Sequence, residues 1–321
     1  MDKQAIIQKY FQKIDQLTVK KDMYRNCVND LLEWILKTDM VQRDLTTKQL
    51  FMKTPHKITA RIYGKQVQTV AGIEEAVYLL DTFTDIHATV TAEDSSSVAA
   101  NQTILELYGS PSEILAYERT ILNILQRLSG IATTTQSIVK QINNLGIAHP
   151  PLIASTRKTP WTLLDKKAVA LGGGATHRLH LGDGVLVKDN HLLLLKEQYG
   201  LKSEPELVVK TIEILSQKVH DMLIEIEVED RKSIEALITT ASTLSSNNTF
   251  CIMLDNFSPE EVTQLLAAYR KKYDLSKIIF EASGGITKTT ISDWATTGVD
   301  VLSLGALTHS TQAIDMSLDI M

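Results

Sequence analysis

The sequence predicts an α/β protein of two lobes, and two patterns along the chain support this class. After Pro151, six short runs of aliphatic and β-branched residues alternate with amphipathic segments, as in parallel strand–helix–strand units. Before Ser110, helical segments flank two stretches of strand-like alternation, which is typical of a small antiparallel sheet that carries helices. The 321 residues are enough to bury both cores. The second lobe is therefore either an open parallel sheet or a barrel.

The first lobe is expected to begin with helices. Apolar residues recur at steps of three and four from Ile6 to Leu17 and from Val28 to Ile35, so each stretch has one apolar face. Strand-like alternation follows at residues 57–62 and 103–107. These segments predict the antiparallel sheet and its covering helices.

Three helix starts can be recognised from their capping residues. Ser110-Pro111-Ser112-Glu113 begins a long helix, which Ser129-Gly130 is expected to break or kink. Ser203 with Glu206, and Ser258 with Glu261, begin two helices of the second lobe. The six strands expected around them are residues 152–154, 185–187, 223–228, 250–254, 278–280 and 301–302.

Charge and composition exclude several classes of function. The net charge of −5, from 33 basic and 38 acidic residues, gives no overall attraction to nucleic acid or to an anionic membrane. No apolar run approaches the roughly 18 residues of a membrane span, and Met1-Asp2-Lys3-Gln4 does not begin a secretory signal. Cys27 and Cys251 match no metal or redox spacing, so we expect reduced cysteines and a cytoplasmic protein.

Basic side chains gather after the first two strands of the second lobe. The carboxyl ends of parallel strands meet at one edge, so residues that follow different strands can form one site. A single lysine or arginine there could simply solvate a loop, but Gly172-Gly173-Gly174 lies among them and suits close approach of the backbone to an anion. The residues of this basic cluster are Arg157, Lys158, His177, Arg178, Lys188 and His191.

Two further glycine-containing turns are candidates for phosphate binding. Ser283-Gly284-Gly285 precedes a helix, and Gly305-Ala306 follows the last strand. Backbone amides at such turns bind phosphate, and barrels often place phosphate at their last two loops. The alternative is two ordinary connections between strand and helix.

Carboxylates follow the third and fourth strands. Glu225, Glu227 and Glu229 alternate along one strand, and Asp255 comes directly after the next. Glu227 and Asp255 could bind a ligand or Mg²⁺, or instead pair with structural cations. A zinc site of His177, His180 and His191 is disfavoured, because no ligand spacing supports it and the neighbouring cations would repel the metal.

Taken in this order, these residues resemble the quinolinate phosphoribosyltransferase family, also called carboxylating nicotinate-nucleotide diphosphorylase. The likeness runs from Asp44 to the end of the chain. The stretches that carry it are 44–47, 71–72, 118–120, 125–133, 156–159, 172–174, 177–178, 188–191, 225–228, 254–257, 283–285, 298–300 and 305–310.

The resemblance implies an open α/β sandwich over residues 1–122 and an incomplete, seven-stranded α/β barrel over residues 123–321, with the C-terminal tail packing back on the first lobe. It implies a homodimer or larger homo-oligomer with a shared active site. The implied reaction joins quinolinate to phosphoribosyl pyrophosphate with Mg²⁺. It then releases carbon dioxide to give nicotinate mononucleotide and pyrophosphate, a step in NAD biosynthesis.

The same resemblance implies a role for each residue of the site. Adjacent carboxylates of quinolinate need several fixed cations, for which arginine forks are well suited. Quinolinate would be held by Arg157, His177, Arg178 and Lys188, with Arg119 from the neighbouring subunit. Phosphoribosyl pyrophosphate would be held by Lys158, Glu227, Asp255, Ser283, Gly284, Gly285, Gly305 and Ala306. The catalytic residues would be Lys158, Glu227 and Asp255, and His191 would give structural support.

The sequence departs from the family pattern near the substrate. Pro160-Trp161-Thr162 stands where the family continues with a longer loop and an arginine, and Thr176 and His180 replace a frequent asparagine and glycine. These departures leave the geometry of the loop near the substrate open. Three other functions are alternatives to the one that the resemblance implies. They are a phosphoribosyltransferase for nicotinate, a molybdenum-associated or inactive relative, and an aldolase-like barrel with a Schiff base at Lys188.

Overall fold

The computed structural model describes residues 2–51, 56–244 and 246–321, and within them the chain forms two compact units. Unit 1 consists of residues 1–13, 140–157 and 175–304, and unit 2 of residues 14–139, 158–174 and 305–321. These boundaries differ from the expected division at residue 122, because the chain enters each unit three times.

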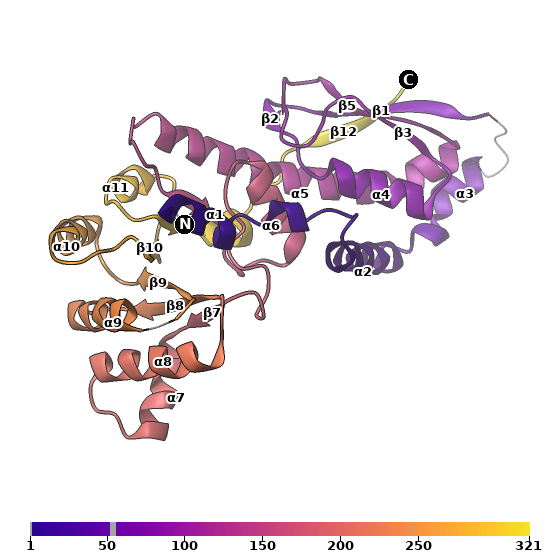
Figure 1. Ribbon diagram of the computed structural model, residues 1–321. Helices are drawn as coiled ribbons and strands as arrows, with labels where there is room; N and C mark the ends of the chain where they lie inside the picture. The colour runs from indigo at the N-terminus through magenta and orange to yellow at the C-terminus, as the bar shows by residue number, and fades with distance from the viewer. Residues whose placement is uncertain (1, 52–55, 245) are drawn as a thin grey trace. The chain divides into compact units, whose positions relative to one another are not determined.

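Unit 1 is built on a six-stranded parallel sheet in the order β6-β11-β10-β9-β8-β7 (Figure 1). All six strands lie where the sequence predicts them. They are β6 (Leu152–Ala154), β7 (Val185–Val187), β8 (Leu223–Val228), β9 (Thr249–Leu254), β10 (Ile278–Ser283) and β11 (Val301–Ser303).

The sheet contains six strands instead of the seven implied by the resemblance. Ala175 forms a single parallel bridge with Ala154 of β6, where a seventh strand would lie. The segment around it is a sharp turn, with Gly173 at φ +88° and His177 at φ +53°, and such backbone cannot extend as a strand. The barrel is incomplete for this reason.

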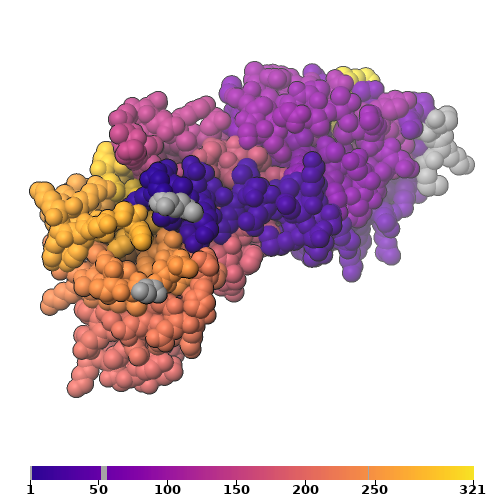
Figure 2. All heavy atoms as spheres, viewed as in Figure 1, coloured from indigo at the N-terminus to yellow at the C-terminus, as the bar shows by residue number. Residues whose placement is uncertain are grey.

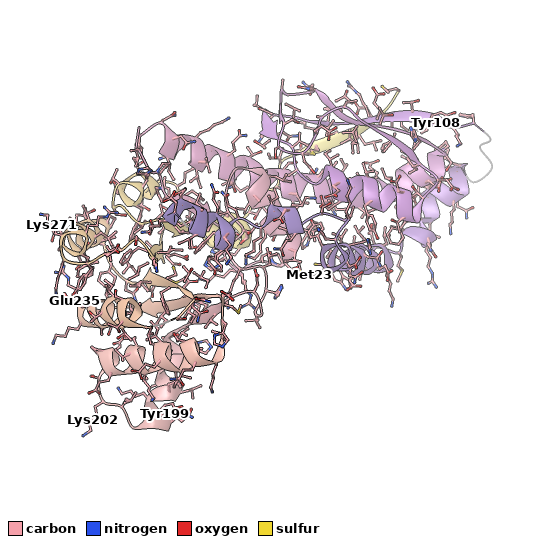
Figure 3. The ribbon with its side chains drawn as sticks, in the orientation of Figure 1. Met23, Tyr108, Tyr199, Lys202, Glu235 and Lys271 are labelled. Atoms are coloured by element: carbon pink, nitrogen blue, oxygen red, sulfur yellow. The ribbon has the colours of Figure 1, made fainter. Side chains whose placement is uncertain are left out.

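Helices cover the outside of this sheet. Ser203 and Ser258 cap α8 and α10 through the expected capping boxes. Tyr199 and Lys202 lie at the tip where α7 meets α8, and Glu235 and Lys271 lie on α9 and α10 (Figure 3). The helices of unit 1 are α1 (Lys3–Phe11), α7 (Asp189–Tyr199), α8 (Glu204–Lys218), α9 (Arg231–Thr243), α10 (Pro259–Lys272) and α11 (Ile291–Ala295).

The N-terminal helix α1 packs into the core of unit 1. Ile7, Tyr10 and Phe11 are buried with strand residues that include Leu223 and Ile279. Figure 2 shows α1 in indigo against the orange and yellow segments of the same unit. The helix ends at Phe11 and a separate turn, η1 (Ile14–Gln16), follows, so the apolar stretch predicted as one helix is two elements.

Unit 2 contains a four-stranded antiparallel sheet in the order β12-β1-β5-β3. The C-terminal strand β12 pairs with β1, so the tail joins the first lobe as the resemblance implied. The strands are β1 (Ile58–Gly64), β3 (His87–Val90), β5 (Thr103–Gly109) and β12 (Met316–Ile320), with β2 (Gln68–Thr69) and β4 (Ser97–Val98) as a separate pair.

The long helix α5 (Pro111–Asn143) is continuous through Ser129-Gly130, so the expected break is wrong. Gly130 has a different purpose, because a Cβ at this position would lie 2.1 Å from the Gln312 carbonyl oxygen. The remaining helical elements of unit 2 are α2 (Asp22–Thr38), η2 (Val41–Arg43), α3 (Leu45–Phe51), α4 (Ile73–Phe83), α6 (Leu163–Leu171) and α12 (Ala306–His309). No helix in the described ranges has the length and apolarity that crossing a membrane requires.

Candidate active site

The predicted site residues of unit 1 follow successive strands of the parallel sheet. Lys188 comes directly after β7, Glu227 lies near the end of β8, and Asp255 comes directly after β9. Ser283 ends β10. Because the strands are parallel and in register, these residues share one edge of the sheet.

A cation and two carboxylates meet at this edge. Lys188 forms an ion pair with Glu227, which is largely buried, whereas Lys188 is exposed. Asp255 neighbours Glu227, and burial together with Glu227 and Glu229 raises the pKa of the Asp255 carboxyl above its ordinary value. The ion pair joins Lys188, which is predicted to bind quinolinate, to Glu227, which is predicted to bind phosphoribosyl pyrophosphate.

The glycine turn after β10 lies against Asp255. A Cβ at Gly284 would be 2.8 Å from the Asp255 Oδ1 atom, and Gly284 and Gly285 have φ values of +91° and +63°. Glycine is therefore required here both by the backbone conformation and by the close carboxylate. The turn leaves the backbone accessible beside Asp255, as a phosphate-binding loop needs.

Arg178 lies half-buried at the same end of unit 1. Its Nη1 donates to the Gly184 carbonyl oxygen at 3.1 Å. Burial and the nearby Arg157 guanidinium lower the pKa of Arg178, while Glu225 opposes this effect. Two guanidinium groups close enough to repel each other form a strong site for a dianion.

His177 is 6% exposed and lies within a buried cluster. Its Nε2 atom is 3.3 Å from a Glu225 carboxylate oxygen and 3.2 Å from a Glu281 carboxylate oxygen. Burial alone would lower the pKa of His177, but Glu281 and Glu225 raise it to about 9. The expected quinolinate ligand therefore faces two carboxylates inside the protein.

The ring nitrogen of His177 and carboxylate oxygens of Glu225 and Glu281 lie within 4.8 Å of one another, close enough to be considered as ligands of a metal ion. Their chemistry fits a proton better than a metal. Against the effect of burial, Glu281 and Glu225 raise the pKa of His177, so a metal would compete with a proton for these atoms. Arg178, which interacts with Glu225, would also repel a metal cation.

Lys158, Gly305 and Ala306 belong to unit 2. Thr308 donates its hydroxyl hydrogen to the Lys158 carbonyl oxygen at 2.8 Å. A Cβ at Gly305 would lie 3.3 Å from the Cδ atom of Lys158, so the lysine stem crosses this turn. The turn and the lysine thus stand together, as a shared role toward one ligand requires.

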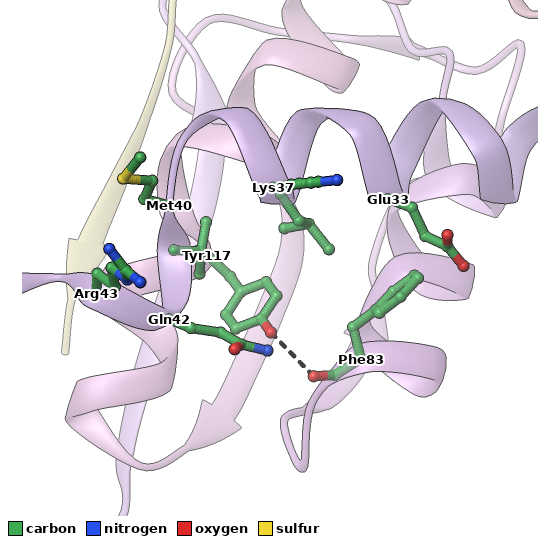
Figure 4. Close-up of a pocket in the computed structure, with 9 residues that line it drawn as sticks. Glu33, Lys37, Met40, Gln42, Arg43, Phe83 and Tyr117 are labelled. Carbon is green, nitrogen blue, oxygen red and sulfur yellow. Dashed lines mark hydrogen bonds between the residues drawn. The ribbon is translucent and has the colours of Figure 1, made fainter.

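Arg119 is exposed on α5 and lines a cavity of about 490 Å³ together with Arg43 and Asp44. A cavity of about 620 Å³ lies beside it in unit 2, where the Tyr117 hydroxyl donates to the Phe83 carbonyl oxygen at 3.0 Å (Figure 4). The other predicted substrate ligands do not line these two cavities. Arg119 thus belongs to unit 2, whereas the other residues expected to bind quinolinate belong to unit 1.

One residue of this region has the role that the sequence suggested, and another was missed. His191 accepts the backbone N–H of Lys188 on Nδ1 at 3.0 Å and so caps α7, which fits its expected supporting role. Glu281 was missed, although strand alternation places it on the same side of β10 as Ser283. That alternation, together with the alternating glutamates of β8, is the signal that could have found the buried cluster.

An incomplete parallel barrel with cations, carboxylates and an open glycine turn at its strand ends defines a transferase site for anionic, phosphorylated substrates. The models of the quinolinate phosphoribosyl transferase N-terminal and C-terminal domains match residues 44–129 and 131–319. The chain therefore belongs to the quinolinate phosphoribosyltransferase family and is a pentosyltransferase by class.

Individual relatives agree with this assignment. The chain is 35% identical over 305 residues to a "probable nicotinate-nucleotide pyrophosphorylase [carboxylating]" of Methanocaldococcus jannaschii, covering 93% of this chain and 99% of the relative. It is 32% identical to the protein of the same description from Bacillus subtilis, covering 90% and 92%. The nicotinate-nucleotide pyrophosphorylase structure from Francisella tularensis superposes with a TM-score of 0.76 at 31% identity, covering 92% and 96%.

Proposed function

We propose that this chain transfers the phosphoribosyl group of phosphoribosyl pyrophosphate to quinolinate and removes one carboxylate, giving nicotinate mononucleotide, pyrophosphate and carbon dioxide for NAD biosynthesis. The observation that carries the proposal is the closeness of Arg157 and Arg178, with Lys188 at the carboxyl end of β7 in the same unit and family membership beside it. Three cations suit a substrate with two adjacent carboxylates better than a substrate with one.

Quinolinate binding relieves a repulsion that is already present in the protein. Arg157 and Arg178 disfavour each other's charge, and a bound dianion would replace that repulsion with attraction to both. Lys188 adds a further cation, which is exposed and pairs with Glu227. We assign quinolinate to these three residues, to Arg119 of a neighbouring subunit and, by resemblance, to His177.

Phosphoribosyl pyrophosphate is assigned to the carboxylate side of the edge. Glu227 and Asp255 would bind ribose hydroxyls and stabilise positive charge that develops at the ribosyl carbon; the two carboxylates lie beside each other. The amides of residues 283–285 and 305–306 suit the 5-phosphate, and Lys158 suits the pyrophosphate.

The residues present also fit Mg²⁺. Glu227 and Asp255 offer neighbouring carboxylate oxygens, the ligand type that Mg²⁺ prefers, and burial together with Glu227 and Glu229 raises the pKa of Asp255. Glu227 and Asp255 would hold the ion, which would neutralise charge on the pyrophosphate. The residues of the chain bind and orient the two substrates around it.

The bond changes then follow from charge. The quinolinate ring nitrogen attacks the ribosyl carbon, the bond to pyrophosphate breaks, and the nitrogen becomes a pyridinium. Loss of carbon dioxide from the neighbouring carbon leaves an electron pair there, which the pyridinium and the adjacent arginines stabilise, and a proton from solvent completes the product. Within this scheme Arg157 and Arg178 serve both binding and decarboxylation.

Turnover of purified protein with Mg²⁺, phosphoribosyl pyrophosphate and either quinolinate or nicotinate tests the proposed reaction. We expect carbon dioxide and nicotinate mononucleotide from quinolinate and no product from nicotinate. Turnover of nicotinate without turnover of quinolinate would contradict the proposal. It would instead favour the related transferase that lacks decarboxylation.

We also propose that the active enzyme is a cytoplasmic homodimer or larger homo-oligomer. Both cysteines are free, in keeping with a reducing compartment, and Arg119 is exposed on α5. If Arg119 completes a neighbour's site, inactive Arg119→Ala and Arg157→Ala chains mixed together should regain part of the activity, since some sites would be intact. Mixed dimers that form and remain inactive would refute the shared site.

A further inference from the structure

The three buried side chains His177, Glu225 and Glu281 come from three different segments. Glu225 lies in β8, Glu281 lies in β10, and His177 lies in the turn that precedes Arg178. Both carboxylates are at most 1% exposed. No hydroxyl or amide of the described residues donates to the Glu281 carboxylate, so the His177 ring is its close polar neighbour.

Both nitrogen atoms of the His177 ring face protein groups. Nδ1 lies 2.6 Å from the backbone nitrogen of Arg178 and accepts its hydrogen. Nε2 then carries the ring hydrogen and points to Glu225 and Glu281. The ring has no polar atom left for a substrate.

The cluster keeps one negative charge beneath the arginines. An imidazolium with two carboxylates and a neutral imidazole with one protonated glutamate both leave a net charge of −1. The Arg178 amide favours the neutral imidazole, because Nδ1 must accept a hydrogen. In either state the charge is opposite to that of Arg178, which Glu225 attracts.

The N-terminal segment holds the same turn from its other side. The Phe11 carbonyl oxygen accepts the backbone N–H groups of Thr176 and His177 at 2.9 and 3.1 Å. The Phe11 ring meets the His177 ring edge to face, with centroids 4.9 Å apart. Lys13 pairs with Asp183 at 2.7 Å, and Asp183 accepts the Leu179 N–H at 2.7 Å.

These contacts fix a backbone conformation that side chains seldom adopt. His177 has φ +53°, and each residue of the turn from 176 to 179 has a backbone N–H bonded to this scaffold or to its own turn, as the preceding contacts show. A strained position persists only where surrounding contacts determine it. The direction in which Arg178 leaves the turn is therefore set by His177 and its partners.

We propose that His177 is a positioning residue that does not contact quinolinate: clamped between Glu225 and Glu281, it holds the turn that presents Arg178 to the substrate. This rests on the proposed function of the site. It reassigns His177 from the set of direct ligands to the support of one of them, and it gives the N-terminal segment around Phe11 a part in the same support.

Two substitutions of His177 test the contacts of Nδ1 and of Nε2 separately. His177→Asn keeps an acceptor near the Arg178 amide and tolerates the left-handed backbone, but does not reach the carboxylates. His177→Gln reaches toward the carboxylates but loses the acceptor. We expect each to raise the KM and the Kd for quinolinate roughly 10- to 100-fold, because a displaced arginine binds poorly, and to leave the KM for phosphoribosyl pyrophosphate unchanged.

Glu281→Gln is the matched variant, since it conserves volume and removes a charge that is remote from the substrate in this scheme. We expect it to raise the KM for quinolinate by a similar factor. An unchanged quinolinate KM in folded Glu281→Gln protein would overturn the proposal, because a His177 that touches substrate alone does not need Glu281. This variant remains decisive if the His177 variants fail to fold.

A double-mutant cycle with Arg178→Lys completes the test. If His177 acts through Arg178, adding His177→Asn to Arg178→Lys should weaken quinolinate binding little further. Losses that multiply in full would show independent contact with the substrate and refute the positioning role. Turnover of quinolinate by the unaltered enzyme is measured first, so a failure of the proposed function is recognised separately.

Discussion

In the described part of each unit a pair of glutamates lies beside a cationic side chain, and the two pairs differ in burial and in the donors that reach their oxygens. In unit 2, Lys167 donates to Glu75 at 2.6 Å and also pairs with Glu74. The Tyr24 hydroxyl donates to Glu75 at 2.6 Å, and the backbone N–H of Val19 donates to Glu74 at 3.2 Å. In unit 1, the Glu225–Glu281 pair has His177 at its centre. Among the described residues, no hydroxyl donates to either oxygen of Glu281, whereas Glu75 of unit 2 lacks a partner at Oε2 and has two donors on its other oxygen.

This difference separates a cluster that serves the fold from one that serves the site. A buried charge with donors from several elements fixes those elements together, as Lys167 of α6 does with α4. A buried charge with too few donors costs stability and persists where its electrostatic effect is needed. The unit 1 cluster lies next to Arg178 in sequence and in space, whereas no expected substrate ligand belongs to the Lys167 cluster.

The largest effect is expected from Lys167→Met. It leaves the 0% exposed Glu75 carboxylate without its cation, which should lower the free energy of unfolding by roughly 3–5 kcal/mol. Chemical denaturation monitored by circular dichroism measures the loss. The quinolinate KM of the protein that remains folded should not change, because the cluster contains none of the proposed ligands.

Lys272→Met is the control for that measurement. Lys272 and Glu235 form an ion pair at 3.2 Å, but the two side chains are 58% and 44% exposed. An exposed pair contributes at most about 1 kcal/mol. Equal losses for the two lysine variants would mean that burial does not make the Lys167 cluster special.

The sequence predicted the strands of unit 1 well because each is a short apolar run between readable helix caps, as at Ser203 and Ser258. It also placed Lys188, Asp255 and Ser283 at one edge, since parallel strands bring their ends together. These features depend on local pattern and on one topological rule, and both are visible in a single sequence.

The sequence could not predict which buried side chains contact each other across the fold. The contact of His177 with Glu281 joins positions about one hundred residues apart, and it depends on a turn whose φ of +53° no residue pattern indicated. The predicted helix break at Gly130 was wrong for the same reason. Glycine is needed there because the Gln312 carbonyl, which is distant in sequence, lies close to the helix. Long-range contacts decided both cases against the local signal.

A smaller effect, with a dependence on pH, distinguishes the two clusters directly. Burial alone would lower the pKa of His177, but Glu281 and Glu225 raise it from 6.5 in the unfolded chain to about 9. Because Nδ1 accepts the Arg178 N–H, this proton is held on the side of the cluster where Nε2 meets the two carboxylates. Its contribution to stability is complete below pH 6.5 and is lost as the pH rises to 9, roughly 3 kcal/mol in all. The neighbouring titratable groups do not reverse this loss of stability with rising pH. Glu225 also has a raised pKa, and Cys251 stays neutral because burial raises its pKa.

The measurement compares unfolding free energies of the unaltered protein, His177→Asn and Lys167→Met at pH 6 and pH 9. Burial would lower the pKa of Lys167, but Glu75 and Glu74 raise it above its ordinary value, so Lys167 stays charged throughout. The loss caused by Lys167→Met should therefore be the same at both pH values, whereas the loss caused by His177→Asn should shrink toward pH 9. A loss for His177→Asn that is independent of pH would show that the unit 1 cluster binds no extra proton, and the contrast between the two clusters would then rest on their donors alone.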